Sequence, residues 1–574
     1  MSAELLLREF DRVAGAPDAV PRLRQFVFDL AVAGMLSHEE IGIEPKPWEQ
    51  RESPLRDVQK EQRGPRFARE GWRRVTVGSM AHMENGDRGK NYPSKQHRVQ
   101  SGIPFVNAGH LRDDHISESD LDFISQQRFE SLRAGKFVRG DILFCLRGSL
   151  GKVALVSNLD GGAIASSLII LRPLPGLAGS FLHLCLKSSD TSSQIKQFDN
   201  GTAQPNLAGK DLSRFQIPLP PLSVQHRIVA KVDELIALCD QLEAAQKKRE
   251  SRRDRLRAAS LHRLAATDES EGARQADVRF FLARSPRLIT KPEHVAEVRQ
   301  TILDLAVRGR LVPQVPGDET AWGLLTRIAA ARGSDPRRAE RAHPIPPSEK
   351  PEPQIASFSL PPSWAWTPWE DIALKIGDID HAMPDAVASG GYPYVSPRDF
   401  RPGNRIDFGT AKKISHGDFT RLAAKIRPEL GDLIYPRYGT IGETRMVLED
   451  RDFLASYSCA VIKVLKPFVD PAFQYIFSIS DIARSQATAS INQATQPNVG
   501  IKSIKQFLFP LPPIEEQHRI VAKVDVLMSV CDNVESALAT TRMGRSRLLE
   551  SLLHEALGGA PVPSCGELVG AVAM

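Results

Sequence analysis

One segment of this sequence occurs twice. Ile217–Asp233 reads IPLPPLSVQHRIVAKVD and Phe509–Asp525 reads FPLPPIEEQHRIVAKVD, which agree at 13 of 17 positions at an offset of 292 residues. The same offset relates Trp72 to Trp364. Self-similarity at a fixed distance is the signature of a repeated architecture, so it limits the possible folds more than composition does. The sequence therefore predicts two copies of one module.

The duplication extends beyond this segment. Leu23–Val32 resembles Val298–Val307 at an offset of 275, and Gly102–Val106 resembles Gly391–Val395. The second copy carries extra residues at 335–354, where six prolines stand among charged residues, and this composition is typical of an extended linker. Its counterpart at 44–66 is similarly polar. We expect a helical segment (1–40), a first globular domain (41–218), a central helical region (219–334), a second globular domain (335–512) and a C-terminal helix with a tail (513–574).

Each globular part contains short apolar runs separated by glycine turns. Copy one has such runs at 141–146 and 153–156, and copy two has them at 432–435 and 459–464. Runs of this length with a later helix indicate a compact mixed α/β domain with a curved sheet. The predicted fold class is thus α/β (α+β), duplicated around a pseudo-two-fold axis.

The repeated segment leads into a helix with a heptad pattern. Apolar residues recur at spacings of four and three, which keeps one stripe facing a partner helix. The stripes, which we call the seams, are Ile228, Val232, Leu235, Cys239 and Leu242 in copy one, and Ile520, Val524, Leu527, Cys531 and Val534 in copy two. A lone amphipathic helix usually packs on its own domain. Because the seam is duplicated, we favour antiparallel pairing of one long helix from each copy.

The first of these helices could run from about Ser223 toward Ala265, which is about 60 Å at 1.5 Å per residue. Within it, residues 247–257 include seven basic side chains. Such a run is most often a solvated helix face. It could equally contact the phosphates of a DNA duplex, and the sequence does not separate the two.

The composition and the net charge are consistent with a globular protein that has a polyanionic partner. Hydrophobic residues make up 41%, charged residues 25%, and the formal net charge is +6 with a pI near 8.9. The six cysteines form no zinc-ligand spacing, so we expect reduced thiols and no metal site. Glu4 and Glu9 make the N-terminus unlike a signal peptide, and no apolar run is long enough to span a membrane. We expect a cytoplasmic protein.

Candidate DNA-binding residues come from loops and glycine turns. The loop 85–95 is basic, whereas its counterpart 377–384 is acidic with one histidine, so the two domains should read different sequences. The turns at 147–152 and 438–443 do not have P-loop spacing and instead present an arginine beside a tight turn. Both copies contain the sequence Gln-Pro-Asn, at 204–206 and at 496–498. A segment shared by the two copies is poorly suited to specify two different sequences, which favours a structural or phosphate-positioning role. The candidates are Arg88, Lys90, Tyr92, Lys95, Asn107, Arg147, Gln204, Asn206, His381, Arg398, Arg437, Tyr438, Gln496 and Asn498.

Motifs for catalysis are missing. The nearest string to an amino-methyltransferase motif, Asp470–Phe473, fails at its second proline, and no Walker A, zinc-protease, nucleophile-elbow or dinucleotide motif is found. We expect no catalytic residues and no enzymatic activity from this chain alone.

The repeated strings together resemble those of the specificity subunits of type I restriction-modification systems. The strings are P-L-P-P-[LI]-x-x-Q-H-R-I-V-A-K-V-D, R-Q-x-[VI]-[LF]-D-L-A-V and P-P-S-W-A-W at Pro361–Trp366. The resemblance implies two domains that each read half of a split DNA site. It also implies that the helices dock two modification subunits, which use S-adenosylmethionine, and that the complex recruits restriction subunits, which use ATP and Mg²⁺. This chain would hold no cofactor.

Two other hypotheses remain. A coiled-coil scaffold without DNA contact would fit the modest net charge and the seams, and salt-dependent DNA binding would count against it. A complete single-chain restriction-modification enzyme is disfavoured by the missing motifs.

Overall fold

The computed structural model describes residues 15–16, 18–37, 72–89, 91–112, 115–198, 205–265, 271–331, 358–380, 383–492 and 497–557. Packing divides the chain into two compact units, which are residues 1–249 with 542–574 (unit 1) and residues 250–541 (unit 2). The predicted linker at 335–354 and its counterpart at 44–66 lie outside the described residues, as does the tail beyond 557.

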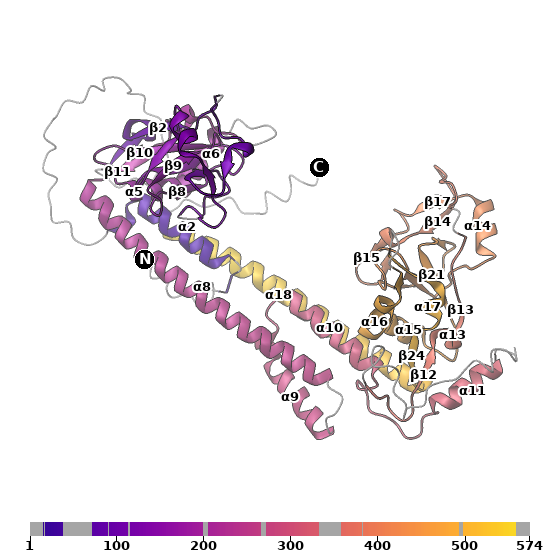
Figure 1. Cartoon of the computed structure of the whole chain (residues 1–574). Helices are drawn as coiled ribbons and strands as arrows, with labels where there is room; N and C mark the ends of the chain where they lie inside the picture. Colours follow the sequence, from indigo (N-terminus) through magenta and orange to yellow (C-terminus); the bar gives the residue numbers. More distant parts are fainter. Residues whose placement is uncertain are drawn as a thin grey trace. The chain divides into compact units, whose positions relative to one another are not determined.

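The globular part of unit 1, residues 73–219, is called domain 1 (Figure 1). Its two main sheets have the strand orders β2-β10-β7-β8 and β3-β5-β4-β9-β6, and β1 pairs with β11 where the chain enters and leaves. The strands are β1 (Arg73–Thr76), β2 (Ala81–Asn85), β3 (Arg98–Val99), β4 (Ile103–Val106), β5 (Asp122–Ile124), β6 (Lys136–Val138), β7 (Ile142–Cys145), β8 (Val153–Leu155), β9 (Gly161–Ile164), β10 (Leu168–Pro173) and β11 (Gln216–Leu219). Its helices are α3 (Val77–Met80), η2 (Lys95–His97), α4 (Gln126–Ser131), α5 (Gly179–Lys187), α6 (Ser189–Phe198) and α7 (Gly209–Leu212).

The globular part of unit 2, residues 365–511, is called domain 2 and repeats this plan. The order β13-β21-β18-β19 matches β2-β10-β7-β8, and β12 pairs with β24 as β1 pairs with β11. The strands are β12 (Ala365–Pro368), β13 (Ala373–Gly377), β14 (Tyr392–Val395), β15 (Phe400–Arg401), β16 (Arg405–Ile406), β17 (Lys412–Ile414), β18 (Leu433–Pro436), β19 (Arg445–Met446), β20 (Leu454–Ala455), β21 (Cys459–Val464), β22 (Ile491–Asn492), β23 (Asn498–Val499) and β24 (Leu508–Leu511). The helices are α13 (Trp369–Ile372), η3 (Pro397–Asp399), α14 (His416–Ala423), α15 (Pro471–Ser478), α16 (Asp481–Ala489) and α17 (Ile501–Lys505). The predicted pair of mixed α/β domains is confirmed.

Strand β7 shows why the apolar runs form central strands. All four of its residues are buried. Because successive side chains point to opposite faces of a sheet, Ile142 and Phe144 join one core cluster while Leu143 and Cys145 join another. In domain 2, Leu433 and Ile434 of β18 divide between two clusters in the same way. A continuous apolar run is what a strand buried on both faces requires.

The remaining helices are α2 (Ala19–Val32), η1 (Met35–Ser37), α8 (Leu222–Ala265), α9 (Glu271–Leu288), α10 (Pro292–Val307), α11 (Ala321–Ala331) and α18 (Ile514–Ala556). The long helix expected from about Ser223 toward Ala265 is therefore present. In unit 1, seam residues Ile228 and Val232 share a core cluster with Val27 of α2. In unit 2, Ile520 shares a cluster with Ile302 of α10. Each seam thus packs on the short helix of its own copy, and the predicted pairing of the two long helices stays a prediction.

A buried glutamine fixes the start of each long helix. The side chain of Gln225 is fully buried, accepts a hydrogen bond from the Ala178 amide at 2.8 Å and donates to the Pro220 carbonyl at 2.9 Å. Gln517 makes the equivalent bonds at the start of α18, to the Asp470 amide and the Pro512 carbonyl. Buried polar groups must be paired, so this amide explains why the glutamine recurs in both repeated segments.

A carboxylate fixes each short helix to its domain. The side chain of Asp29 on α2 accepts a hydrogen bond from the Ser189 amide at 2.7 Å, at the start of α6. Asp304 on α10 accepts one from the Asp481 amide at 3.1 Å, at the start of α16. Each carboxylate satisfies an N–H group that the helix cannot pair internally. The upstream repeat is therefore part of the domain's architecture.

Candidate nucleic-acid interface

The basic loop of domain 1 is ordered by one carboxylate. Asp87 accepts hydrogen bonds from the amides of Gly89 at 2.7 Å and Arg133 at 3.0 Å. These backbone donors, Arg133 first, lower the pKa of Asp87. Arg88 and Lys95 are both exposed. The one carboxylate of the loop, Asp87, is therefore buried, whereas the cationic side chains of Arg88 and Lys95 are exposed to solvent.

Two candidates near this loop hold the domain together. The ring of Tyr92 packs edge-on against Phe105 at 6.0 Å between ring centroids. The amide of Asn107 donates to Asp122 at 3.3 Å and its oxygen accepts from the Gly109 amide at 2.7 Å. Both side chains are half-buried and engaged within the domain. Their contacts shape the surface and leave little side chain for a ligand.

The glycine turns lie against the Gln-Pro-Asn segments. Arg147 and Asn206 form an isolated backbone bridge, and the exposed Arg147 guanidinium donates through Nε to the Asn206 side-chain oxygen at 3.2 Å. In domain 2 the equivalent bridge joins Tyr438 to Asn498. This pairing agrees with a structural role for the two asparagines. It also shows that Tyr438, and not Arg437, takes the place of Arg147.

The structure contradicts the prediction that Arg437 is presented beside the glycine turn as a DNA-binding residue. Its side chain is 5% exposed, donates to the Val499 carbonyl at 3.0 Å and forms an ion pair with Asp378. The equivalent residue in copy one is Leu146 at 1% exposure. A guanidinium enclosed in this way serves the domain's interior and is not presented to DNA.

The remaining candidates divide between exposed and undescribed residues. Arg398 lies on η3, where Ser396 and Asp399 form a capping box, and its side chain is 70% exposed. The other candidates lie outside the described residues, and they are Lys90, Gln204, His381 and Gln496.

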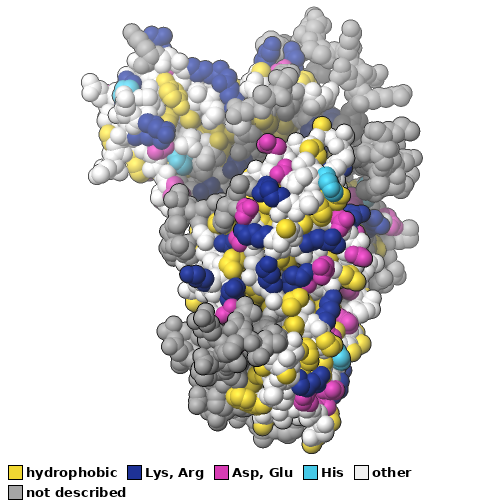
Figure 2. Space-filling model, turned by 90° about the vertical axis from the view of Figure 1, so that its right-hand side faces the viewer, with side chains coloured by type: hydrophobic (Ala, Val, Ile, Leu, Met, Phe, Trp, Pro, Cys, Tyr) yellow, Lys and Arg dark blue, Asp and Glu magenta, His cyan; other side chains and the backbone are white. Residues whose placement is uncertain are grey.

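The basic run of α8 is only partly free for a ligand. Arg257 is buried and forms ion pairs with Asp254 at 2.7 Å and Glu297 at 2.9 Å, while Lys247 pairs with Glu243 at 2.6 Å. The exposed members of the run include Lys248, Arg249, Arg252 and Arg255. On the face of the molecule that Figure 2 views, Lys and Arg side chains are interspersed with Asp and Glu side chains. Part of the run is therefore engaged in ion pairs within the protein, and the other part remains available for contact with phosphates.

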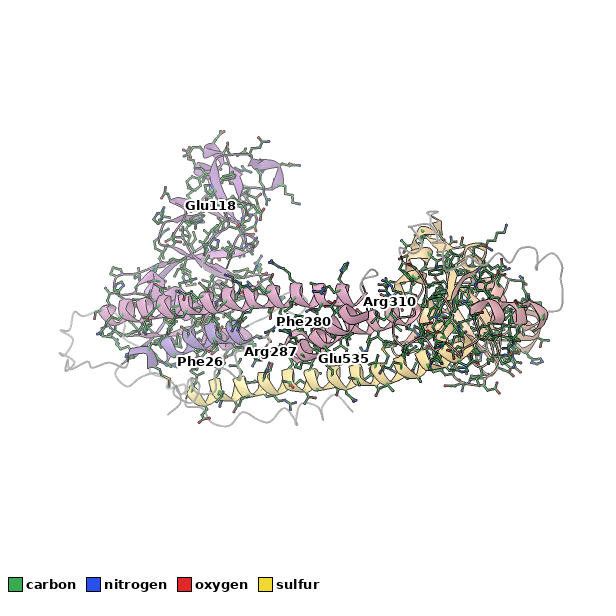
Figure 3. All side chains as sticks on the ribbon, turned by 90° about the horizontal axis from the view of Figure 1, so that it is seen from below. Phe26, Glu118, Phe280, Arg287, Arg310 and Glu535 are labelled. Atoms are coloured by element: carbon green, nitrogen blue, oxygen red, sulfur yellow. The ribbon has the colours of Figure 1, made fainter. Side chains whose placement is uncertain are left out.

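An apolar groove runs between α2 and α8 in unit 1. Its volume is about 340 Å³, and its lining is Leu23, Phe26, Val27, Leu30, Leu235, Leu238, Cys239 and Leu242. Phe26 is labelled in Figure 3. Leu238 on its rim is 53% exposed. The offsets of 275 and 292 place Val298, Thr301, Ile302, Leu305, Leu527, Val530, Cys531 and Val534 at the equivalent positions in unit 2, where Val530 is 52% exposed.

The ion pairs beside this groove are also duplicated. Arg24 on α2 pairs with Asp240 at 2.5 Å and Glu243 at 2.6 Å on α8. Arg299 on α10 pairs with Asp532 at 2.6 Å and Glu535 at 2.7 Å on α18. Burial raises the pKa of the seam thiols Cys239 and Cys531, so both behave as small apolar residues. Each copy therefore places a strip of mostly apolar residues at corresponding positions beside an equivalent set of ion pairs, with Thr301 in copy two where copy one has Phe26.

The sequence interpretation missed two groups. It did not single out Gln96 and Gln127, which lie on opposite sides of a hollow in domain 1, although α4 differs in sequence from its counterpart in copy two. It also gave no role to Asp29 and Asp304. Within the described ranges, no three His, Cys, Asp or Glu side chains are grouped to hold a metal ion. No described helix is long and apolar enough to cross a membrane.

Comparison with known families decides the assignment. The family model described as "Type I restriction modification DNA specificity domain" matches residues 69–250 and 373–539, which together are more than half of the chain. The chain belongs to this family. The first match covers domain 1 and the start of α8, and the second covers most of domain 2 and the start of α18, so the internal repeat is a repeat of the family's domain.

Relatives match along most of the chain. The type I restriction enzyme EcoAI specificity subunit of Escherichia coli is 25% identical, with 94% of each chain covered. The EcoEI specificity subunit of the same organism is 23% identical over 94% of each chain. A solved HsdS subunit from Thermoanaerobacter tengcongensis is 19% identical with a TM-score of 0.41, covering 86% of this chain and 98% of that one. This chain is a DNA-recognition subunit of the type I class.

Proposed function

We propose that domain 1 reads one half and domain 2 the other half of a bipartite, asymmetric DNA target. The observation that carries this is the contrast between the copies. Their strand order, buried glutamines and carboxylate anchors match, whereas loop 85–95 is basic and 377–384 is acidic. One scaffold with two different loop chemistries suits two different half-sites. A scaffold protein without DNA contact would not need this difference.

We further propose that the chain is not catalytic and that the partner subunits it binds carry out the reactions. Two modification subunits would supply S-adenosylmethionine-dependent methylation, and restriction subunits would supply ATP- and Mg²⁺-dependent cleavage. The chain itself would hold no cofactor and would work in the cytoplasm, where DNA and these cosubstrates are found. The named relatives are specificity subunits, which supports this division of labour.

The duplicated apolar strip supports two modification subunits per chain. An apolar groove between two helices takes the apolar face of a third helix. Since the corresponding positions in copy two are also mostly apolar, one helix from each of two identical partner subunits can fit. Leu238→Asp and Val530→Asp place a charge on the exposed rim of each strip. Native mass spectrometry should show two partner subunits on the wild type, one on each single variant and none on the double variant.

The control is Leu256→Asp, an exposed leucine of α8 outside the strip, 42% exposed in the wild type. This variant should keep two partner subunits. If the double variant also keeps two, the strips are not the docking sites.

The central test is a map of methylated adenines in DNA from cells that express this chain with its modification subunits. Methylation confined to one split, asymmetric sequence is the expected result. Replacing residues 71–218 with the corresponding domain of a relative should change one half-site and leave the other unchanged. Methylation without sequence preference would refute the proposal.

A further inference from the structure

Domain 1 contains an open polar hollow of about 450 Å³. It lies between the η2 turn with strand β3 on one side and helix α4 on the other. The pairing of β3 with β5 brings these segments together, with Arg98 opposite Ile124 and Val99 opposite Phe123. The lining residues are Gln96, His97, Val99, Ser125, Gln127, Arg128 and Ser131.

The walls of the hollow are braced by Arg128. Its guanidinium donates to the Tyr92 carbonyl at 3.4 Å and lies 3.1 and 3.2 Å from the two ring nitrogens of His97. The His97 ring is also 2.8 Å from the Ser94 hydroxyl. Phe129, next along α4, packs into the core cluster that contains Phe105. The two sides of the hollow are therefore fixed relative to each other before any ligand binds.

The amides at the hollow are available for a ligand. Gln96 and Gln127 are exposed, and among the described residues their side-chain amides have no hydrogen-bonding partner. Arg88 and Lys95, which are also exposed, belong to the basic loop that leads into this region. Amides with a free donor and a free acceptor beside cations form a surface suited to the edge of a base within a polyanion.

Copy two keeps the scaffold of α4 and replaces its exposed face. Ser125 caps α4 through the Arg128 amide at 3.2 Å, and Ser415 caps α14 through the Asp418 amide at 3.1 Å. The buried Leu132 likewise corresponds to Leu422. Between these shared residues, Gln126-Gln127-Arg128 is replaced by His416-Gly417-Asp418.

The replaced residues of copy two are also differently engaged. Arg421 of α14 pairs with Asp418 at 3.0 Å and with Asp380 at 3.5 Å, and Lys425 also pairs with Asp380. The charged side chains on this face of domain 2 form ion pairs within the domain, whereas the amides of Gln96 and Gln127 in domain 1 have no hydrogen-bonding partner among the described residues. Surface divergence alone would replace exposed residues but would not leave a braced hollow with unpaired amides.

We propose that this hollow reads the edge of an adenine in the half-site of domain 1, with Gln127 and Gln96 as the reading side chains. The inference rests on the proposed DNA-reading function and assigns residues to it. A glutamine amide can donate to adenine N7 and accept from its N6 amino group, which no other base edge in the major groove allows. Arg128 acts as a positioning residue because its guanidinium is already held by His97 and the Tyr92 carbonyl.

The experiment maps methylated sites for the full-length chain co-expressed with its modification subunits. Gln127→Ala and the Gln96→Ala/Gln127→Ala variant should relax one position of one half-site, with discrimination against the wrong base falling by about 5- to 150-fold. Gln127→Glu should shift that position toward cytosine, because a carboxylate accepts from the cytosine amino group but cannot donate to adenine N7. The other half-site should be unchanged in all three.

The matched control is Gln126→Ala on the same short helix. Gln126 lies outside the lining of the hollow, and its amide donates to Glu130 at 2.8 Å. This variant should keep the wild-type half-site. Thermal unfolding of each variant within a degree or two of the wild type would show that domain 1 is intact.

The outcomes separate the two claims. A wild-type chain without a bipartite target would overturn the proposed function, and with it this inference. A bipartite wild type whose half-site is unchanged in the double variant would overturn the inference alone. A uniform loss of affinity for all sequences with a smaller salt dependence would also overturn it, because that is the signature of phosphate contact.

Discussion

The carboxyl group of Asp304 should make the stability of unit 2 depend on pH. This side chain is 8% exposed on α10, where it accepts the Asp481 amide. Burial, together with the nearby Asp481 charge, raises the pKa of Asp304 to about 6 from an ordinary value of 3.8. Asp304→Asn keeps the hydrogen-bond acceptor and removes the ionisation.

The sign follows from the raised pKa. Below about pH 4 the carboxyl is neutral in both the folded and the unfolded chain, and its contribution to stability is fully present. As pH rises toward 6 the unfolded chain ionises first, so the folded state loses stability relative to the unfolded state. A shift of about two pKa units corresponds to a loss of about 3 kcal/mol above pH 7, and about half of that is already lost at pH 5.

The assay is denaturant unfolding of the full chain, followed by tryptophan fluorescence. Trp364, Trp366 and Trp369 are all buried in the core cluster of unit 2 that also contains residues of α10, so their emission reports on this unit. The free energy of unfolding of Asp304→Asn minus that of the wild type should grow by about 1 to 2 kcal/mol between pH 5 and pH 7.5.

Asp29→Asn is the matched control because Asp29 holds the equivalent position in unit 1. It should leave the transition reported by the three tryptophans of unit 2 unchanged at both pH values. If the difference between Asp304→Asn and wild type is the same at pH 5 and pH 7.5, Asp304 does not have a raised pKa and the reasoning fails.

Two further changes test the packing of domain 2. Gly391 has φ +81°, and a Cβ there would collide with the Ile414 carbonyl oxygen, so Gly391→Ala should lower the free energy of unfolding by more than about 1 kcal/mol. Gly439→Ala, with φ +71° but open space around it, should cost less; equal losses would contradict the steric argument. Arg437→Leu removes the buried guanidinium of the ion pair with Asp378 and should cost about 3 kcal/mol by denaturant unfolding. The double change with Asp378→Gly, which restores the residues of copy one, should recover most of this; no recovery would show that the pair is not the cause.

The repeat made the architecture predictable because it reports on backbone geometry. The buried Gln225 and Gln517 bind backbone groups that exist in every copy of the domain, so the same residue is needed at both helix starts. The seam spacing likewise identified a long helix with one buried stripe. The partner of that stripe was not predictable from spacing. A period of 3.5 residues says that a stripe is covered but does not say by which helix.

Side-chain direction at strand ends was harder to predict than the strands themselves. Arg147 and Arg437 each precede a glycine turn, but the turn of copy two has one more residue between the arginine and its first glycine. A shift of one residue along an extended chain turns a side chain to the opposite face. Arg147 therefore points to solvent and Arg437 into the core. The hollow could not be predicted from the sequence for a related reason, since the segments that carry Gln96 and Gln127 are brought together only by the pairing of β3 with β5.

The Arg437–Asp378 pair also limits what a difference between the copies can mean. Copy one has Leu146 and Gly86 at these positions, so the copies diverge inside the domain as well as on its surface. Divergence alone therefore does not identify a residue that reads DNA. A reading residue must also be exposed and must keep polar atoms unpaired within its own domain, because a base edge needs free donors and acceptors. Arg437 fails both requirements, because it is buried and its guanidinium is paired, while Gln127 meets both.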